Sequence, residues 1–170
     1  MVIVVQTYPS PAKADLSKMR VENRVRAILL DADNRLVLIR REKAGIPPYY
    51  VAPGGGVEPS DASFHAALRR EMREELGGTI QIHRLVYITE VLRGADLRVR
   101  QLYYVCRLQS INLAARNGPE FNDPARGKYI VERVSLLPTA LEKLRILSDD
   151  LKLFLIINAF KLFQLPEIQP

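Results

Sequence analysis

Three glutamates that follow a run of glycines are the residues of this 170-residue chain whose types and spacing best suit chemistry. Glu71, Glu74 and Glu75 stand at i, i+3 and i+4, so on a helix their carboxylates gather on one face. Like charges this close repel one another unless divalent cations neutralise them, and carboxylate oxygens suit Mg²⁺ or Mn²⁺. The same spacing also occurs on solvated helix faces, so the triplet alone does not establish a metal site.

The glycine run itself predicts a loop, because neither a helix nor a strand favours Pro53 to Gly56 in its interior. Glycine backbone groups can approach a cation or a phosphate closely, since no side chain stands in the way. A short strand at 49–52 leads into this loop, and a helix is expected from about Ser63 to Leu76, with Ser60 or Asp61 as its N-cap. The loop and the glutamates together, on one strand–loop–helix unit, are more specific than either feature alone.

The remaining pattern predicts an α+β fold, an α-β-α sandwich in which a mixed central β-sheet has flanking helices. The chain is expected to form one domain over residues 1–170, with a core at about 20–136 and a C-terminal helical segment at 139–164. The apolar last helix is expected either to enter the core or to form a homodimer contact. Strands are expected at 1–6, 23–31, 35–41, 49–52, 80–93, 97–108 and 129–134, and helices near 141–145 and from 149 or 150 to about 163.

The composition favours an ordinary globular protein, since 48% of the residues are hydrophobic and 26% are charged. Cys106 is the only cysteine, so no disulfide can form within the chain. The net charge of +6 favours an anionic partner, but the scattered basic residues suit a small phosphorylated molecule as well as nucleic acid. The absence of a basic block or an aromatic-rich face counts against RNA, so a nucleic-acid partner is not expected. The N-terminus lacks the pattern of a signal peptide and no segment is long enough to span a bilayer, so the expected location is cytoplasmic.

The segment that begins at Arg70 resembles the signature of the Nudix hydrolase family (MutT-like). It matches Arg-Glu-U-x-Glu-Glu-x-Gly, with U a bulky apolar residue, and Pro-Gly-Gly-Gly-Val-Glu-Pro precedes it as is typical of that family. The resemblance covers Arg24 to about Val134 and implies the Nudix fold. The sequence departs from the signature in two places. The first glutamate of the signature is replaced by Asp61, counted from Gly55, with one extra residue before Arg70, or by Ala62, counted from Gly56; the closing apolar position is a glycine.

The resemblance implies that Glu71, Glu74 and Glu75 ligate Mg²⁺ or Mn²⁺, with a carbonyl of Gly55 or Gly56 completing the ligand set. Arg70 would orient these carboxylates. The cations would bridge a diphosphate, and water would attack one phosphorus in line. The general base is left open between Glu74, Glu75 and Glu120, a carboxylate of a later loop, with Glu132 a poorer fit.

The substrate expected from the resemblance is a nucleoside diphosphate derivative, such as a nucleoside triphosphate or ADP-ribose. Arg26, Arg40 and the glycine loop at Gly56 are candidates for binding its phosphate or ribose, although surface charge also explains either arginine. Two alternatives remain at this stage: a non-catalytic Nudix-fold module that binds nucleotides, and a pyrophosphohydrolase of RNA 5′ ends.

Overall fold

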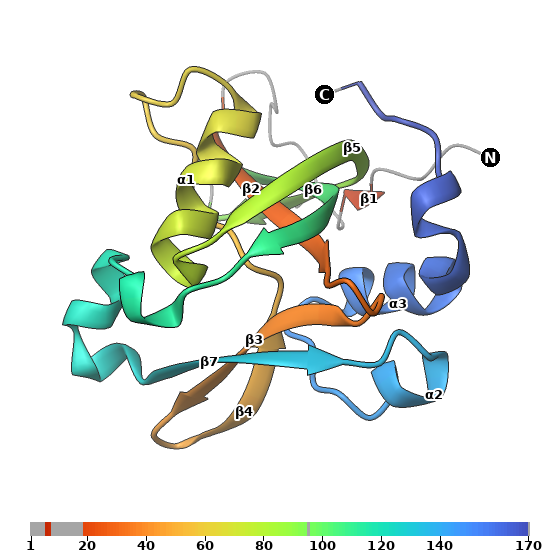
Figure 1. The fold of residues 1–170 in the computed structure, drawn as a ribbon. Coiled ribbons are helices and arrows are strands. Elements are labelled where there is room, and N and C mark those ends of the chain that lie inside the picture. Colours follow the sequence, from red (N-terminus) through yellow and green to blue (C-terminus); the bar gives the residue numbers. More distant parts are fainter. Residues whose placement is uncertain (1–5, 8–18, 95, 170) are drawn as a thin grey trace.

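A computed structural model describes residues 6–7, 19–94 and 96–169, in which a seven-stranded mixed sheet has helices on both faces (Figure 1). Residues 1–5 of the expected first strand lie outside the described residues. The strands are β1 (Gln6–Thr7), β2 (Arg20–Leu30), β3 (Leu36–Lys43), β4 (Ile46–Val51), β5 (Thr79–Arg93), β6 (Leu97–Ser110) and β7 (Lys128–Val134). The helices are α1 (Phe64–Leu76), α2 (Pro138–Leu141) and α3 (Asp149–Asn158), with 3₁₀ turns η2 (Leu113–Ala115), η3 (Pro119–Asn122), η4 (Pro124–Arg126) and η5 (Ala159–Gln164).

Strand β2 lies near the centre of the sheet, whose order is β1-β5-β6-β2-β3-β4, with β7 paired to β3. It runs parallel to β6 along its whole length, while β5 and β6 form a long antiparallel pair. Strands β2 and β3, both predicted, pair as a hairpin, and Asn34 in its turn has a φ of 58°. Asparagine tolerates this left-handed conformation better than most residues, which explains why the turn forms there.

Two hydrophobic clusters, one on each face of the sheet, confirm the predicted sandwich. On one face Leu68, Met72 and Leu76 of α1 pack against apolar side chains of β2, β5 and β6. On the other face α2 and α3 cover the sheet, and Phe154 stacks on Tyr87 with their ring centroids 4.6 Å apart. Burial of each large apolar side chain contributes roughly 1.5–3 kcal/mol, so the two clusters anchor α1 and α3 on opposite faces (Figure 1).

Two of the predicted element boundaries were wrong. The N-cap of α1 is Ser63, whose hydroxyl accepts from the Ala66 amide at 3.1 Å, rather than Ser60 or Asp61. Asp61 cannot cap this helix because its carboxylate accepts from the Glu58 amide and from a guanidinium on α1. Strand β4 begins at Ile46, so its two prolines lie inside the strand. They are tolerated because β4 is an edge strand and its pairing with β3 is irregular opposite them, between Arg41 and Lys43.

The C-terminal helices differ in part from their prediction. The first is the single turn α2, which ends at Leu141 instead of beginning there, because Pro138 starts it. The second is confirmed, although it continues as a 3₁₀ turn after Asn158. Its inner face enters the core, while Leu153, Ile157 and Phe160 are 58%, 65% and 76% exposed. Among the described residues, no helix has both the length and the apolar character needed to cross a bilayer.

Candidate active site

The glycine loop is fastened to the edge of β2 as if it extended the sheet. The Val25 amide donates to the Gly55 carbonyl and the Ala27 amide to the Pro53 carbonyl, each at 2.9 Å. Gly54 has a φ of 128°, and a Cβ there would lie 2.2 Å from the Val25 carbonyl oxygen. Only glycine fits this position, so the close approach of loop to strand explains the glycine at position 54.

Helix α1 presents Glu75 toward this loop from its buried side. The Glu75 carboxylate is 9% exposed and accepts a hydrogen bond of 2.6 Å from the Gly54 amide. The helix ends directly after it, where Gly77 adopts the left-handed conformation and donates back to the last turn. Met72 and Leu76 pack into the hydrophobic cluster between α1 and the sheet, which fixes the rotation of the helix. That rotation buries Glu75 against the loop.

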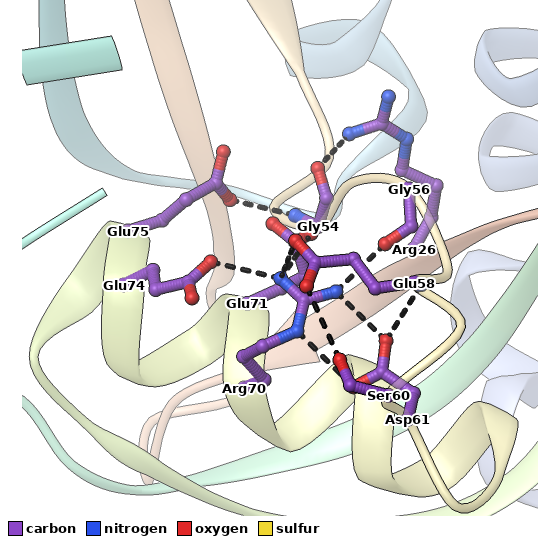
Figure 2. Close-up of polar contacts among 10 residues, drawn as sticks. All are labelled: Arg26, Gly54, Gly56, Glu58, Ser60, Asp61, Arg70, Glu71, Glu74 and Glu75. Carbon is purple, nitrogen blue, oxygen red and sulfur yellow. Dashed lines mark hydrogen bonds and ion pairs between the residues drawn. The ribbon is translucent and has the colours of Figure 1, made fainter. Parts of the chain in front are cut away.

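Arg70 is the centre of a half-buried polar network on the same helix (Figure 2). Its Nη1 donates to Glu71 at 3.0 Å and to Glu74 at 2.9 Å. Its Nη2 donates to the Gly56 carbonyl at 2.8 Å, which ties the loop to the helix. Its Nε and Nη2 also donate to the two carboxylate oxygens of Asp61, at 3.1 and 2.9 Å. One guanidinium therefore orients two of the predicted metal ligands.

Asp61 is the functional residue that the sequence identified least clearly. Its bidentate pairing with Arg70 is the kind of planar contact that guanidinium groups favour. This pairing places an acidic partner for Arg70 where the signature has its first glutamate, counted from Gly55. The sequence left this equivalence open between Asp61 and Ala62, because one extra residue lies before Arg70. The acidic side chain of Asp61, at or next to the position of the first glutamate of the signature, was the sequence feature that could have identified it.

Burial and charge act on these carboxylates in opposite directions. The pKa of Glu75 is raised to about 8, chiefly by burial and in addition by the charges of Glu71 and Glu120, while the Gly54 amide and Arg26 oppose the rise. Burial likewise raises the pKa of Glu71, although Arg70 opposes the rise. The carboxylates in the interior of the site therefore carry charge at an energetic cost, which a bound cation would reduce.

Glu120 approaches the same site from the loop after β6. The Asn117 and Gly118 amides donate to the Glu74 carbonyl oxygen, at 3.2 and 3.3 Å, and so fasten this loop to the end of α1. Glu120 Oε1 is buried without a hydrogen-bond partner among the described residues. Its charge raises the pKa of Glu75, so the two carboxylates are within electrostatic reach of each other.

The donor set fits a hard divalent cation, although it does not form a closed cage. In the described part of the chain, no three acidic, histidine or cysteine side chains converge into a preformed metal site, because Arg70 draws Glu71 and Glu74 to itself. The Glu71 oxygens instead occupy the space beside Gly55, 2.5 Å from where a Cβ would lie. Buried, mutually repelling carboxylates and the partnerless oxygen of Glu120 are the groups that Mg²⁺ or Mn²⁺ would satisfy.

A cavity of about 380 Å³ opens on the other face of β2, between the sheet and the first turn of α3. Its floor includes Arg26, Gln101 and the buried ring of Tyr103, and its outer wall includes Ser148 and Asp150. The volume lies within the range of small-molecule sites, and the mixed polar and aromatic lining suits a nucleoside. Apart from Arg26, the sequence did not identify these residues, because they come together only when α3 packs on the sheet.

The three predicted substrate-binding residues differ in their surroundings. Arg26 lines the cavity and also donates to the carbonyl of Gly54 in the glycine loop. Gly56 accepts from Arg70 and lies in that loop. Arg40 is engaged by Glu132 and Glu42, which raise its pKa, and it lies outside the lining of the cavity. Glu132 also accepts from the Tyr50 hydroxyl at 2.8 Å, so it belongs to that cluster and not to the carboxylate site.

The sequence matches a family model described as the NUDIX domain over residues 21–140. Among curated proteins the chain has no significant match.

Solved structures share the fold at low sequence identity. The chain superposes on the ORF135 protein of E. coli with a TM-score of 0.59 and 22% identity, covering 86% of this chain and 94% of that one. A NUDIX hydrolase from Nitrosomonas europaea gives a TM-score of 0.63 at 16% identity, with coverage of 83% and 89%. An ADP-ribose pyrophosphatase from Streptococcus suis gives 0.53 at 18% identity, with coverage of 82% and 92%.

Proposed function

Because this chain belongs to the Nudix family and is a hydrolase of the pyrophosphatase class, we propose that it cleaves the diphosphate linkage of a nucleotide with Mg²⁺ or Mn²⁺. The observation that carries the proposal is the packing of Glu71 and Glu75 against a glycine loop that β2 and Arg70 hold from two sides. A solvated surface helix would leave these carboxylates exposed. Their burial supports a role in binding a cation.

In this proposal Glu71, Glu74 and Glu75 hold the cation, with the Gly55 carbonyl as a backbone ligand. When bound, the cation supplies positive charge for the diphosphate and acidifies water. Arg70 keeps Glu71 and Glu74 in register with the loop through its contacts with Asp61 and with the Gly56 carbonyl. Arg70 thus keeps both carboxylates beside the loop, although the acidic side chains of the described residues do not converge on one point in the absence of a cation.

We assign the general base to Glu120, with Glu74 and Glu75 as the alternatives. The partnerless, buried Oε1 of Glu120 is available to accept a proton, whereas the Glu74 and Glu75 carboxylates already accept from Arg70 and Gly54. A water oxygen attacks one phosphorus and its proton passes to the carboxylate. The bond from that phosphorus to the bridging oxygen breaks, and the bridging oxygen leaves with the other phosphate.

The nucleoside part of the substrate is proposed to occupy the cavity beside Arg26. This assignment places the base and ribose in the cavity on one face of β2 and the diphosphate at the glycine loop. Arg26 contacts both places, because it lines the cavity and donates to the Gly54 carbonyl. Solved neighbours include MutT proteins and an ADP-ribose pyrophosphatase, so nucleoside triphosphates and ADP-ribose both belong in a substrate test.

The test is product release from dGTP, oxidised dGTP, ADP-ribose, a dinucleoside tetraphosphate and UDP-glucose with Mg²⁺ and then Mn²⁺. Glu71→Gln and Glu75→Gln are each expected to lower kcat at least about 100-fold, because each removes a charge from the cation site. Glu142→Gln, at an exposed carboxylate beside α2, is the matched control and should retain wild-type turnover. Nucleotide binding without any product, by calorimetry, would replace the proposal with a non-catalytic binding module.

A further inference from the structure

Arg26 lies between the cavity and the glycine loop and contacts both. Its side chain lines the cavity, and its Nε donates to the Gln101 side chain of the cavity floor at 3.3 Å. Its Nη1 donates to the carbonyl oxygens of Gly54 and, at 3.4 Å, of Ala52. Figure 2 shows the guanidinium reaching the Gly54 carbonyl from the side opposite Glu75. Within the described residues its Nη2 has no protein partner, so this nitrogen remains free for a ligand.

Gly54 transmits this contact to the carboxylate site. Its carbonyl accepts from Arg26, and its amide donates to Glu75 at 2.6 Å. The residue has little freedom to relax, because a backbone with a φ of 128° packs against the Val25 carbonyl. The Arg26 contact is therefore one of the hydrogen bonds that maintain this constrained conformation, and its loss would remove one restraint on the residue whose amide contacts Glu75.

We propose that Arg26 is a positioning residue that couples occupancy of the cavity to the arrangement of the catalytic carboxylates. The inference rests on the proposed function, since the occupant is the nucleoside part of the substrate. A nucleoside that contacts Nη2 holds the guanidinium in place, and Arg26 then holds Gly54 and Glu75 for reaction. Binding of the nucleoside, which does not react, therefore raises kcat and does not only lower KM.

Arg24 offers a matched control within the same cavity. It lies two residues before Arg26, on the same face of β2, and it also lines the cavity. Its guanidinium pairs with Glu22, at 2.7 and 2.6 Å, and has no contact with the loop in the described chain. A substitution of its side chain leaves the backbone bridge between Arg24 and Gly56 in place. Arg24 can therefore affect substrate affinity without acting on Glu75.

The experiment compares Arg26→Lys and Arg24→Lys with wild type on the best substrate of the panel. Lysine keeps the charge but cannot bridge the loop and Gln101 at once. Arg26→Lys is expected to lower kcat roughly 10- to 100-fold with a smaller change in KM, because the loop is misplaced. Arg24→Lys is expected to change KM and leave kcat within about twofold. Equal kcat in wild type and Arg26→Lys, or the same pattern in both variants, would overturn the inference.

A second measurement does not depend on turnover. Mn²⁺ binding is followed by electron paramagnetic resonance with and without adenosine or guanosine, which can occupy the cavity but carry no phosphate. Because coupling is reciprocal, the nucleoside that binds should tighten Mn²⁺ at least about fivefold in wild type and not in Arg26→Lys. Gln101→Ala, which removes the partner of Nε only, should reduce the effect and serves if Arg26→Lys does not fold.

These two measurements separate the inference from the proposed function. If wild type hydrolyses no substrate while the nucleoside still tightens Mn²⁺ through Arg26, the proposed activity fails and the coupling stands. If wild type hydrolyses a nucleotide but Arg26→Lys matches it in kcat and in the Mn²⁺ titration, the coupling alone is refuted.

Discussion

Glu75 is the carboxylate whose burial has the largest consequence for stability. The sign follows from its pKa, which burial raises to about 8 in the folded chain from an ordinary value of 4.5. The folded protein therefore favours the protonated form, and the contribution of this group to stability is complete below pH 4.5 and lost as pH rises toward 8. Without divalent cations, raising the pH across this window should destabilise the fold.

The magnitude follows from the same values. A pKa of about 8 against 4.5, at about 1.4 kcal/mol per pKa unit, corresponds to at most about 5 kcal/mol. Glu75→Gln removes the ionisation but keeps an oxygen that can accept from the Gly54 amide. In the variant this part of the pH dependence should disappear.

The assay is urea unfolding of wild type and Glu75→Gln at pH 5 and pH 8.5 in the presence of EDTA. The quantity compared is the change in the free energy of unfolding between the two pH values, because groups that do not interact with Glu75 contribute equally to both proteins. Wild type should lose several kcal/mol more than the variant, and addition of Mg²⁺ should reduce that difference. Equal pH dependence of the two proteins would show that Glu75 ionises freely in the fold and would refute the reasoning.

Three further variants test the glycine loop and the contact between Asp61 and Arg70. Gly55→Ala places a Cβ 2.5 Å from the Glu71 carboxylate, a flexible group that can move, so turnover should fall at least about 10-fold while the melting temperature stays near that of wild type. Gly54→Ala instead meets fixed backbone at a positive φ and should cost about 2 kcal/mol or more in chemical denaturation, and equal stability of the two variants would contradict this contrast. Asp61→Asn weakens the charged contact with Arg70 and should lower kcat about 10- to 100-fold in steady-state assays, whereas unchanged kcat would show that Asp61 does not position the arginine.

Local pattern was sufficient to predict most elements and the centre of the site. Helical spacing placed Glu71, Glu74 and Glu75 on one helix beside a glycine loop, and the pattern of apolar residues placed the strand that became β3. These predictions succeeded because helix and strand periodicity is a property of neighbouring residues. The end of α1 was predicted for the same reason, since Gly77 adopts a conformation that few other residues accept.

Tertiary packing decided the features that depend on distant residues. Asp61 was expected as an N-cap, yet it pairs with Arg70. This pairing forms because the loop before α1 folds back and brings Asp61 next to the Arg70 side chain. The burial of Glu75 depends on the rotation of α1 against the sheet, and the cavity depends on the packing of α3 near Gln101. Sequence alone determined which residues could carry chemistry. Only the fold determined which of them lose their water and therefore interact strongly, because desolvation depends on what packs around a group and not on its neighbours in the chain.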